Sequence, residues 1–148
     1  MEKIITKSRE ETAKAGEEFG RTLKKGDIIA YRGGLGAGKT AFTCGLVKGA
    51  GLTNAEVSSP TFALVNEYKG SDFSIYHFDM YRIQSEEGLE STGFFDYDFE
   101  NNIAVIEWSE NISEFLPEST IYITITPKEE NEREITIGKG INYADYGN

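Results

Sequence analysis

The sequence predicts an α/β protein of three layers, with a mixed sheet between helices and antiparallel strands toward the C-terminus. Three observations predict it. Apolar strand-like runs alternate with helix-like runs early in the chain, a glycine-rich loop joins one such strand to a helix, and alternating runs separated by polar turns follow later. This order is typical of a sheet with helices packed on its faces. With 148 residues the chain has room for one core, so a single domain over residues 1–148 is expected.

The N-terminal part is predicted to form a strand, a helix and a second strand. Residues 4–6 have the composition of a short strand. Ser8 and Glu11 then have the spacing of a capping box, which predicts a helix start there and a helix that runs to about Leu23. A Gly-Asp turn ends that helix, and the apolar run 28–31 is predicted to be a buried strand.

The second helix is predicted to span residues 39–48 and to end at Gly49 and Gly51, because glycine commonly terminates helices. The rest of the chain has the alternation of strands. Residues 138–148 are rich in glycine and asparagine and are expected to be loosely ordered. The later strands are predicted at residues 61–68, 73–82, 103–108, 120–126 and 133–137.

The loop before the second helix matches the G-x-x-x-x-G-K-[ST] motif of P-loop NTPases, with a strand on one side and a helix on the other. Its glycines let the backbone turn N–H groups toward a phosphate. Lys39 can reach the β and γ phosphates, and Thr40 can offer its hydroxyl to Mg²⁺. The motif therefore predicts binding of a nucleoside triphosphate. The candidate nucleotide-binding residues here are Gly33, Gly34, Leu35, Gly36, Ala37, Gly38, Lys39, Thr40 and Ala41.

Two carboxylates are candidates for the Mg²⁺ and hydrolysis chemistry that a P-loop enzyme needs. Glu107 ends an apolar strand and is expected at the sheet edge where ligands bind in open α/β folds, so it is the first choice as metal ligand. Asp79 lies in a strand that is too apolar to carry an acid without a purpose. The alternative for Asp79 is an ion pair with Arg82 or a turn contact.

Three further residues have open interpretations. Thr61 follows Ser-Ser-Pro in a loop where nucleotide-switched proteins keep a hydroxyl that senses the γ-phosphate; a simple turn before a strand is the alternative. His77 alternates with apolar neighbours and has no partner for a metal, which favours a structural role. Trp108 could stack on a base or on a partner, or belong to the core.

Composition limits the kinds of partner. The formal net charge of −10 argues against tight binding of nucleic acid by the chain itself, so contact with RNA is expected to be indirect. The chain has no apolar run of the length that crosses a bilayer and no signal-peptide pattern at its start. A single cysteine, Cys44, agrees with a reducing compartment. A cytoplasmic protein is expected.

The motifs together resemble the TsaE family of P-loop ATPases, which acts in bacterial tRNA threonylcarbamoyladenosine biosynthesis. The resemblance covers nearly the whole chain and rests on the glycine loop, Ser-Pro-Thr-Phe followed by Tyr68, Tyr-His-Phe-Asp-Met-Tyr-Arg at 76–82, and Ile-Glu-Trp-Ser-Glu at 106–110. It implies a small cytoplasmic ATPase that works with TsaD and TsaB, binds Mg-ATP and hydrolyses it slowly alone. Contact with tRNA would come only through the complex.

Carried over by position, the resemblance implies that Lys39 and the loop amides hold the phosphates and that Thr40 and Glu107 hold Mg²⁺. It implies that Thr61 and Asp79 serve hydrolysis and switching. Trp108 would support the site.

The resemblance also points loosely to Arg9 or Glu10 and to Arg133 near the adenine. The chain departs from the family pattern at Gly34, where aspartate is common, and at Cys44, where arginine is common. Neither departure removes a phosphate or metal ligand.

Two other hypotheses remain beside the partner-stimulated ATPase. A small-molecule kinase would transfer the γ-phosphate of ATP, but such enzymes usually clamp the donor with lid arginines, and residues 86–102 contain no Lys or Arg. A non-catalytic module ordered by nucleotide would not need Thr40, Asp79 and Glu107. The reaction products discriminate among the three: free phosphate, a phosphorylated acceptor, or neither.

Overall fold

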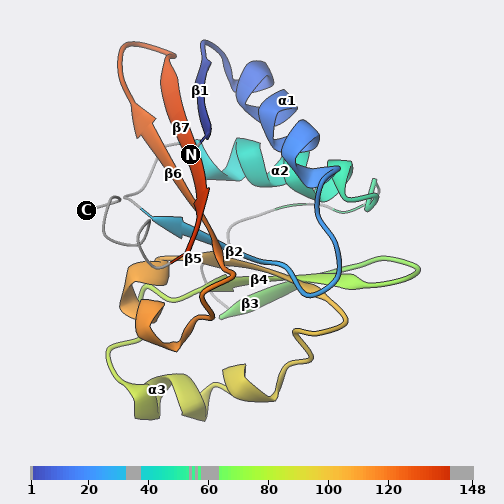
Figure 1. Ribbon diagram of the computed structural model, residues 1–148, viewed down its shortest axis with the longest axis vertical. Helices are drawn as coiled ribbons and strands as arrows, with labels where there is room; N and C mark the ends of the chain where they lie inside the picture. Colours follow the sequence, from blue (N-terminus) through green and yellow to red (C-terminus); the bar gives the residue numbers. More distant parts are fainter. Residues whose placement is uncertain (1, 33–37, 54, 56, 58–63, 141–148) are drawn as a thin grey trace.

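The computed structural model describes residues 2–32, 38–53, 55, 57 and 64–140. These residues form a mixed seven-stranded sheet with helices on both faces (Figure 1), which confirms the predicted α/β class and its three layers. The strands are β1 (Glu2–Thr6), β2 (Ile28–Arg32), β3 (Val65–Lys69), β4 (Ser74–Asp79), β5 (Ile103–Glu107), β6 (Ile121–Pro127) and β7 (Arg133–Lys139). The helices are α1 (Arg9–Gly20), α2 (Lys39–Gly49) and α3 (Glu86–Ser91), with the 3-10 turns η1 (Phe94–Asp96), η2 (Ser109–Asn111) and η3 (Ser113–Phe115).

The strand order across the sheet is β1-β7-β6-β2-β5-β4-β3. The four central strands β6, β2, β5 and β4 are parallel, whereas β7 with β1 on one side and β3 on the other pair antiparallel to their neighbours. The right-handed twist is large: β1, β6 and β7 run nearly upright in Figure 1, while β3 and β4 lie nearly level. The predicted C-terminal antiparallel strands are therefore confirmed. The carboxyl ends of β2, β4 and β5 lie at one edge.

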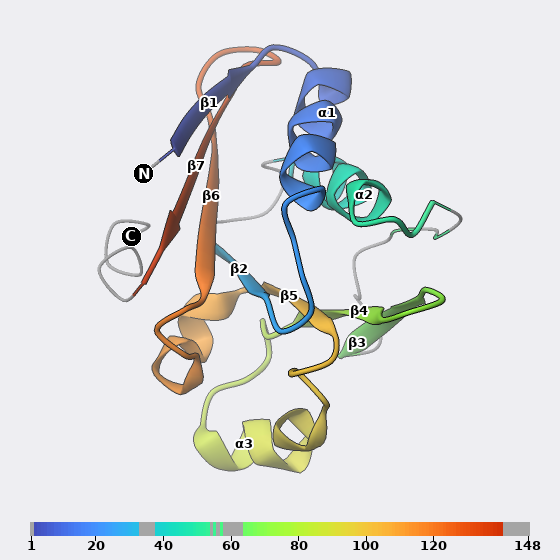
Figure 2. The same ribbon diagram turned by 45° about the vertical axis from the view of Figure 1, so that its right-hand side comes forward.

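The two faces of the sheet carry different layers, as Figure 2 shows from a second side. Helices α1 and α2 cover one face, where Phe42 and Leu46 of α2 pack on Ile29 and Val105 of the sheet. Helix α3 and the turn η1 cover the other face, together with an aromatic cluster around Phe78. Alternate residues of β2, β4 and β5 consequently face different layers, as the period of a strand requires.

Helices α1 and α2 cross with their backbones in contact, and glycines make this possible. A methyl group at Gly45 would lie 1.8 Å from the carbonyl oxygen of Ala13, and one at Gly16 would lie 2.1 Å from that of Phe42. Gly20 and Gly49 make equally close contacts one turn further along their helices. The pair α1–α2 is thus locked together by four positions at which only glycine fits.

The ends of both long helices differ from the predicted ones. The Ser8 cap is confirmed, since its Oγ accepts the Glu11 N–H at 3.0 Å, but α1 ends at Gly20 rather than near Leu23. α2 ends at Gly49, one residue later than predicted, and Gly49 is a helical residue packed on α1 rather than the residue that breaks the helix. The break expected at Gly51 is confirmed by its left-handed φ of 104°.

The bounds of the strands also differ from the predicted ones, notably at the ends of β4 and β7. β4 ends at Asp79, and the chain turns there with the Tyr81 N–H bonded to Asp79 Oδ1 at 2.9 Å and the Ile83 N–H bonded to the Met80 carbonyl at 3.1 Å. β7 continues to Lys139, so residues 138 and 139 are ordered in the sheet and only residues 141–148 of the segment expected to be loose lie outside the described part.

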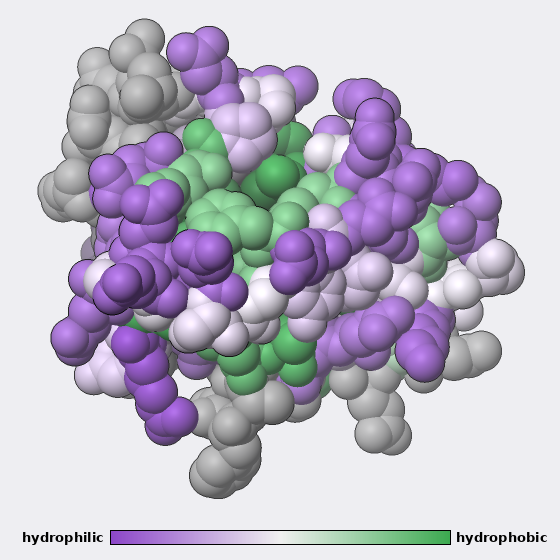
Figure 3. Space-filling model, turned by 90° about the horizontal axis from the view of Figure 1, so that it is seen from below, coloured by the Kyte–Doolittle hydropathy of each residue, from purple (hydrophilic) through white to green (hydrophobic). Residues whose placement is uncertain are grey.

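The end of the molecule formed by α3 was not predicted from the sequence as a helix. Figure 3 looks onto this end, where apolar green surface is framed by hydrophilic purple side chains. Phe95 of η1 is 47% exposed and contacts the ring of Phe115. Of the helices formed by the described residues, none has both the length and the apolar character that a membrane crossing requires.

Candidate functional site

The start of α2 has a backbone arrangement that favours an anion. Gly38 takes the N-cap position with φ 91° and has no side chain to cap the helix, whereas α1 and α3 are capped by serines. First-turn N–H groups without a side-chain cap, together with the helix dipole, favour a phosphate. Thr40 is exposed there and Ala41 is buried, so Ala41 can contribute through its backbone only. The other predicted loop residues, Gly33, Gly34, Leu35, Gly36 and Ala37, lie outside the described residues.

Lys39 is the cation of this site and is only 6% exposed. Its Nζ lies 5.4 Å from the centre of the Trp108 ring, a cation–π contact. Burial lowers the pKa of the Lys39 ammonium, and the negative charges of Glu107, Glu110 and Asp79 oppose that shift. The ammonium therefore sits among three carboxylates in a poorly hydrated place, where its electrostatic interactions are stronger than in water.

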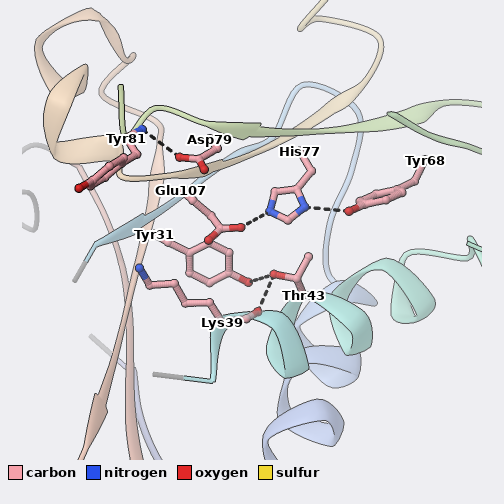
Figure 4. A network of polar contacts seen from close by, with 8 residues as sticks. All are labelled: Tyr31, Lys39, Thr43, Tyr68, His77, Asp79, Tyr81 and Glu107. Atoms are coloured by element: carbon pink, nitrogen blue, oxygen red, sulfur yellow. Dashed lines mark hydrogen bonds and ion pairs between the residues drawn. The ribbon is translucent and has the colours of Figure 1, made fainter. Parts of the chain in front are cut away.

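Asp79 and Glu107 end neighbouring parallel strands and pair directly in register. Both lie on the sheet face toward α2, so their carboxylates and Lys39 gather at one place (Figure 4). Asp79 Oδ1 accepts the Tyr81 N–H at 2.9 Å, which is the turn contact that the sequence left as an alternative. This hydrogen bond holds one carboxylate oxygen of Asp79. Asp79 takes part in the turn and is still the direct neighbour of Glu107.

The turn after Glu107 has unusual backbone geometry. Trp108 adopts φ 58° and ψ 41°, the left-handed region that a bulky residue enters at a cost of roughly 1–3 kcal/mol. Ser109, which is fully buried, holds the turn by donating from Oγ to the Tyr31 carbonyl oxygen at 2.7 Å. The strand that enters the glycine loop and the strand that carries Glu107 are thereby tied together.

Trp108 is shared by two parts of the site. One contact of its ring is Lys39, and another is the ring of Tyr81, whose centre lies 4.9 Å away. A groove of about 530 Å³ opens here. The described residues that line it are Tyr81, Arg82, Ile83, Gln84, Trp108 and Asn111. Trp108 therefore links the buried cation with an open surface.

A second polar chain supports the first turn of α2 from the sheet. The Thr43 hydroxyl donates to the Lys39 carbonyl oxygen at 2.7 Å, so it accepts from the Tyr31 hydroxyl, also at 2.7 Å. Burial raises the pKa of the Tyr31 phenol well above its usual range, which keeps it a donor. This chain fixes α2 against β2 at the position of the lysine.

Of the three residues that the resemblance placed near the adenine, the structure brings Arg133 to the start of α2 and leaves Arg9 and Glu10 away from it. A methyl group at Gly38 would lie 3.9 Å from Arg133 Nε, so Arg133 of β7 reaches the start of α2. Arg9 and Glu10 are exposed on the first turn of α1. The α1 residue that approaches Gly38 is Thr12, at 3.7 Å from the same methyl position.

The donor set fits Mg²⁺. This ion takes oxygen ligands, keeps several waters, and is usually bound by one or two carboxylates together with substrate phosphates. Glu107 and Asp79 supply carboxylates and Thr40 supplies a hydroxyl at the start of α2. The described residues contain no cluster of three or more His, Cys, Asp or Glu that could hold a metal. Thr61, predicted to sense the γ-phosphate, lies outside the described residues.

The sequence matches the model of a known protein family. A family model described as "Threonylcarbamoyl adenosine biosynthesis protein TsaE" matches residues 6–135. The chain belongs to the TsaE family. The TsaE family takes part in tRNA threonylcarbamoyladenosine biosynthesis, which confirms the resemblance found in the sequence.

Relatives and a solved structure agree with this assignment. The tRNA threonylcarbamoyladenosine biosynthesis protein TsaE of Treponema pallidum is 36% identical over 91% of this chain and 98% of its own length. Its namesake in Bacillus subtilis is 37% identical over 88% of this chain and 81% of its own length. The crystal structure of YdiB from Bacillus subtilis superposes with a TM-score of 0.74 at 31% identity, covering 98% of this chain and 89% of YdiB.

Sequence reasoning missed several residues of this TsaE-family site. Glu110 acts on Lys39 through its charge, and it stands three residues after Glu107, where the quoted motif already contained it. Thr43 stands one helical turn after Lys39, a spacing that predicts the hydrogen bond to the lysine carbonyl. No signal in the sequence predicted the Ser109 contact, because its partner Tyr31 is 78 residues away.

Proposed function

We propose that this TsaE-family chain is an ATPase subunit of the tRNA threonylcarbamoyladenosine machinery, which binds Mg-ATP and hydrolyses it slowly. The observation that carries the proposal is the meeting of Lys39, Asp79 and Glu107 at the start of α2. A cation for phosphates, an uncapped helix start and two paired carboxylates are what phosphoryl chemistry on a P-loop needs. Hydrolysis would require little more of the protein than positioning and charge.

Each side chain has a part in this proposal. Lys39 binds the β and γ phosphates, and the amides at the start of α2 add hydrogen bonds to them. Thr40 and Glu107 hold Mg²⁺, which when bound neutralises charge on the phosphate oxygens. Asp79 lies beside Glu107 and orients water for attack, together with Thr61. Arg133 extends from β7 toward the nucleotide, and Trp108 covers the ammonium of Lys39.

The proposal includes partners. TsaB and TsaD would stimulate hydrolysis, and the nucleotide state of this subunit would reset their complex between cycles. The net charge of −10 fits a cytoplasmic subunit that contacts tRNA only through those partners.

The test is phosphate release from Mg-ATP by the purified chain, alone and with TsaB and TsaD from the same organism. Slow release alone and strong stimulation by the partners is the expected result. ATP binding without stimulation would contradict the proposal, and a phosphorylated acceptor in the products would replace it with the kinase hypothesis.

Replacing Glu107 by glutamine should leave metal-free ADP binding intact and remove most Mg²⁺-dependent hydrolysis. Glutamine keeps the shape and an acceptor oxygen for neighbours but loses the charge that Mg²⁺ needs. We expect hydrolysis to fall by about a hundredfold or more, the usual effect of removing one preorganised charge partner. Calorimetry of ADP binding with and without Mg²⁺ measures how much the metal contributes to ADP affinity, separately from any effect on hydrolysis.

The matched control for Glu107→Gln is Glu90→Gln, the same change at an exposed residue of α3, and it should alter neither quantity. Asp79→Asn is the informative comparison. If Asp79→Asn removes the Mg²⁺ effect on ADP affinity while Glu107→Gln preserves it, the metal role belongs to Asp79 and the assignment to Glu107 is wrong.

A further inference from the structure

Glu107 is held from the sheet side by a line of buried polar side chains. His77 of β4 is 1% exposed, and its Nε2 lies 2.5 Å from Glu107 Oε2. The other ring nitrogen, Nδ1, lies 2.8 Å from the hydroxyl of Tyr68 on β3, which is 5% exposed. The line crosses three adjacent strands on the face toward α2 (Figure 4).

The chemistry of the groups fixes the direction of the first contact. A carboxylate only accepts hydrogen bonds, so Nε2 carries a proton and donates it to Glu107. The Tyr68 hydroxyl is then the partner at Nδ1, where a neutral ring accepts. Burial of such a chain is costly unless each group is paired. Two buried polar side chains, paired with each other and in line with the carboxylate of Glu107, therefore require a reason beyond core packing.

We propose that His77 is a positioning residue for Glu107, and that Tyr68 orients the His77 ring for this purpose. The inference rests on the proposed function, because it assigns the pair to the carboxylate that would hold Mg²⁺. Glu107 has rotatable bonds beyond the end of β5, and its side chain is 12% exposed. The His77 N–H restricts it to one rotamer that faces Lys39 and the start of α2.

The size of the effect follows from the behaviour of groups that orient metal ligands in other proteins. Removing such a hydrogen-bond partner typically weakens metal affinity or activity by about 10–100-fold, while the ligand itself remains. A structural histidine, as the sequence alone favoured for His77, would instead reduce stability and leave the Mg²⁺ dependence of the folded protein unchanged.

The first experiment reads the geometry directly in the unsubstituted chain. His77 is the only histidine, so long-range proton–nitrogen NMR of the tag-free protein shows one ring and needs no assignment. We expect a slowly exchanging proton on Nε2. A ring that carries its proton on Nδ1 alone would overturn the proposal, because it could not donate to Glu107.

The second experiment compares two substitutions by the Mg²⁺ dependence of ADP affinity, with hydrolysis as a second readout. His77→Gln places an amide near the position of Nε2 and should retain much of the Mg²⁺ effect. His77→Asn is too short to reach Glu107 and should reduce the Mg²⁺ effect by about tenfold or more. Metal-free ADP affinity should stay unchanged in both. Equal behaviour of the two variants would overturn the proposal.

A double substitution tests whether His77 acts through Glu107. In the Glu107→Gln background, His77→Asn should cause no further loss of the Mg²⁺ effect, because residues that act as one unit are not additive. An additional loss of the same size would overturn the proposal. Tyr68→Phe keeps the ring and should cause a smaller loss in the same direction, so the proposal stays testable if His77→Asn folds poorly.

The control for losing a buried hydroxyl is Tyr122→Phe. Tyr122 is 5% exposed and lies on the opposite face of the sheet, beside Ala30; its change should leave the Mg²⁺ effect as it is. Absence of Mg-ATP binding by the unsubstituted chain would overturn the proposed function itself. Normal binding with an unchanged Mg²⁺ effect in His77→Asn would overturn only the role of His77.

Discussion

Replacing Lys39 by alanine should remove most of the affinity of the chain for ATP and ADP. The side chain is buried, and its charge faces Asp79, Glu107 and Glu110. Without the ammonium, these three carboxylates would repel the phosphates of the nucleotide that we propose binds there. A hydrogen bond to a charged group contributes about 1.5–3 kcal/mol, so a loss of about a hundredfold is expected. Isothermal calorimetry with ADP and ATP measures it.

Lys48→Ala is the matched control for that substitution. Lys48 is exposed in the last turn of the same helix, so its loss makes the net charge more negative by the same amount but away from the site. Affinity in Lys48→Ala should match that of the unsubstituted chain. Equal affinities in Lys39→Ala and the unsubstituted chain would show that the nucleotide is bound elsewhere.

Gly45→Ala should be the most destabilising single methyl group that can be added to helix α2. The new methyl would lie 1.8 Å from the Ala13 carbonyl oxygen and 2.7 Å from the Glu17 amide nitrogen. Both contacts are backbone atoms that cannot rotate away, so α1 and α2 must separate and lose the packing between them. Overpacking usually lowers the free energy of unfolding by about 1–3 kcal/mol. For Gly45→Ala we expect a loss of about 3 kcal/mol or more. Urea denaturation followed by circular dichroism gives the change in the free energy of unfolding.

The same change at Gly88 separates this effect from the helix propensity of alanine. Gly88 lies in α3, and the nearest atom to a methyl there is the Ser85 Oγ, a side-chain atom, at 3.3 Å. Because alanine favours a helix by about 1 kcal/mol over glycine, Gly88→Ala should cost little or nothing. A similar loss of stability in both variants would mean that the close crossing of α1 and α2 does not limit the fold.

The sequence predicted the parts of the site that depend on local chemistry. Lys39 could be identified because the motif needs only a loop between a strand and a helix, and neighbouring residues specify both. Glu107 and Asp79 could be predicted as a pair of candidates because an acid at the end of an apolar strand is unusual. Their direct pairing followed once the two strands proved to be parallel neighbours.

The remaining features depend on how distant segments meet. The contact between His77 and Glu107 joins residues 30 apart and requires the exact register of β4 and β5, since a slip of one residue would turn His77 to the other face. The close crossing of α1 and α2 at their glycines was not predicted, because nothing local in the sequence shows which helix lies against them. Gly49 was interpreted as a helix end for that reason.

Trp108 gives the protein a built-in optical signal. It is the only tryptophan of the chain, and its ring lies 5.4 Å from the Lys39 ammonium. Light emitted by this indole comes from one known position, and under the proposed function it would depend on whether the neighbouring charge stays over the ring or moves to a phosphate. Occupancy of the site can therefore be followed by intrinsic fluorescence in the unlabelled protein, in real time and in the presence of any partner that lacks tryptophan.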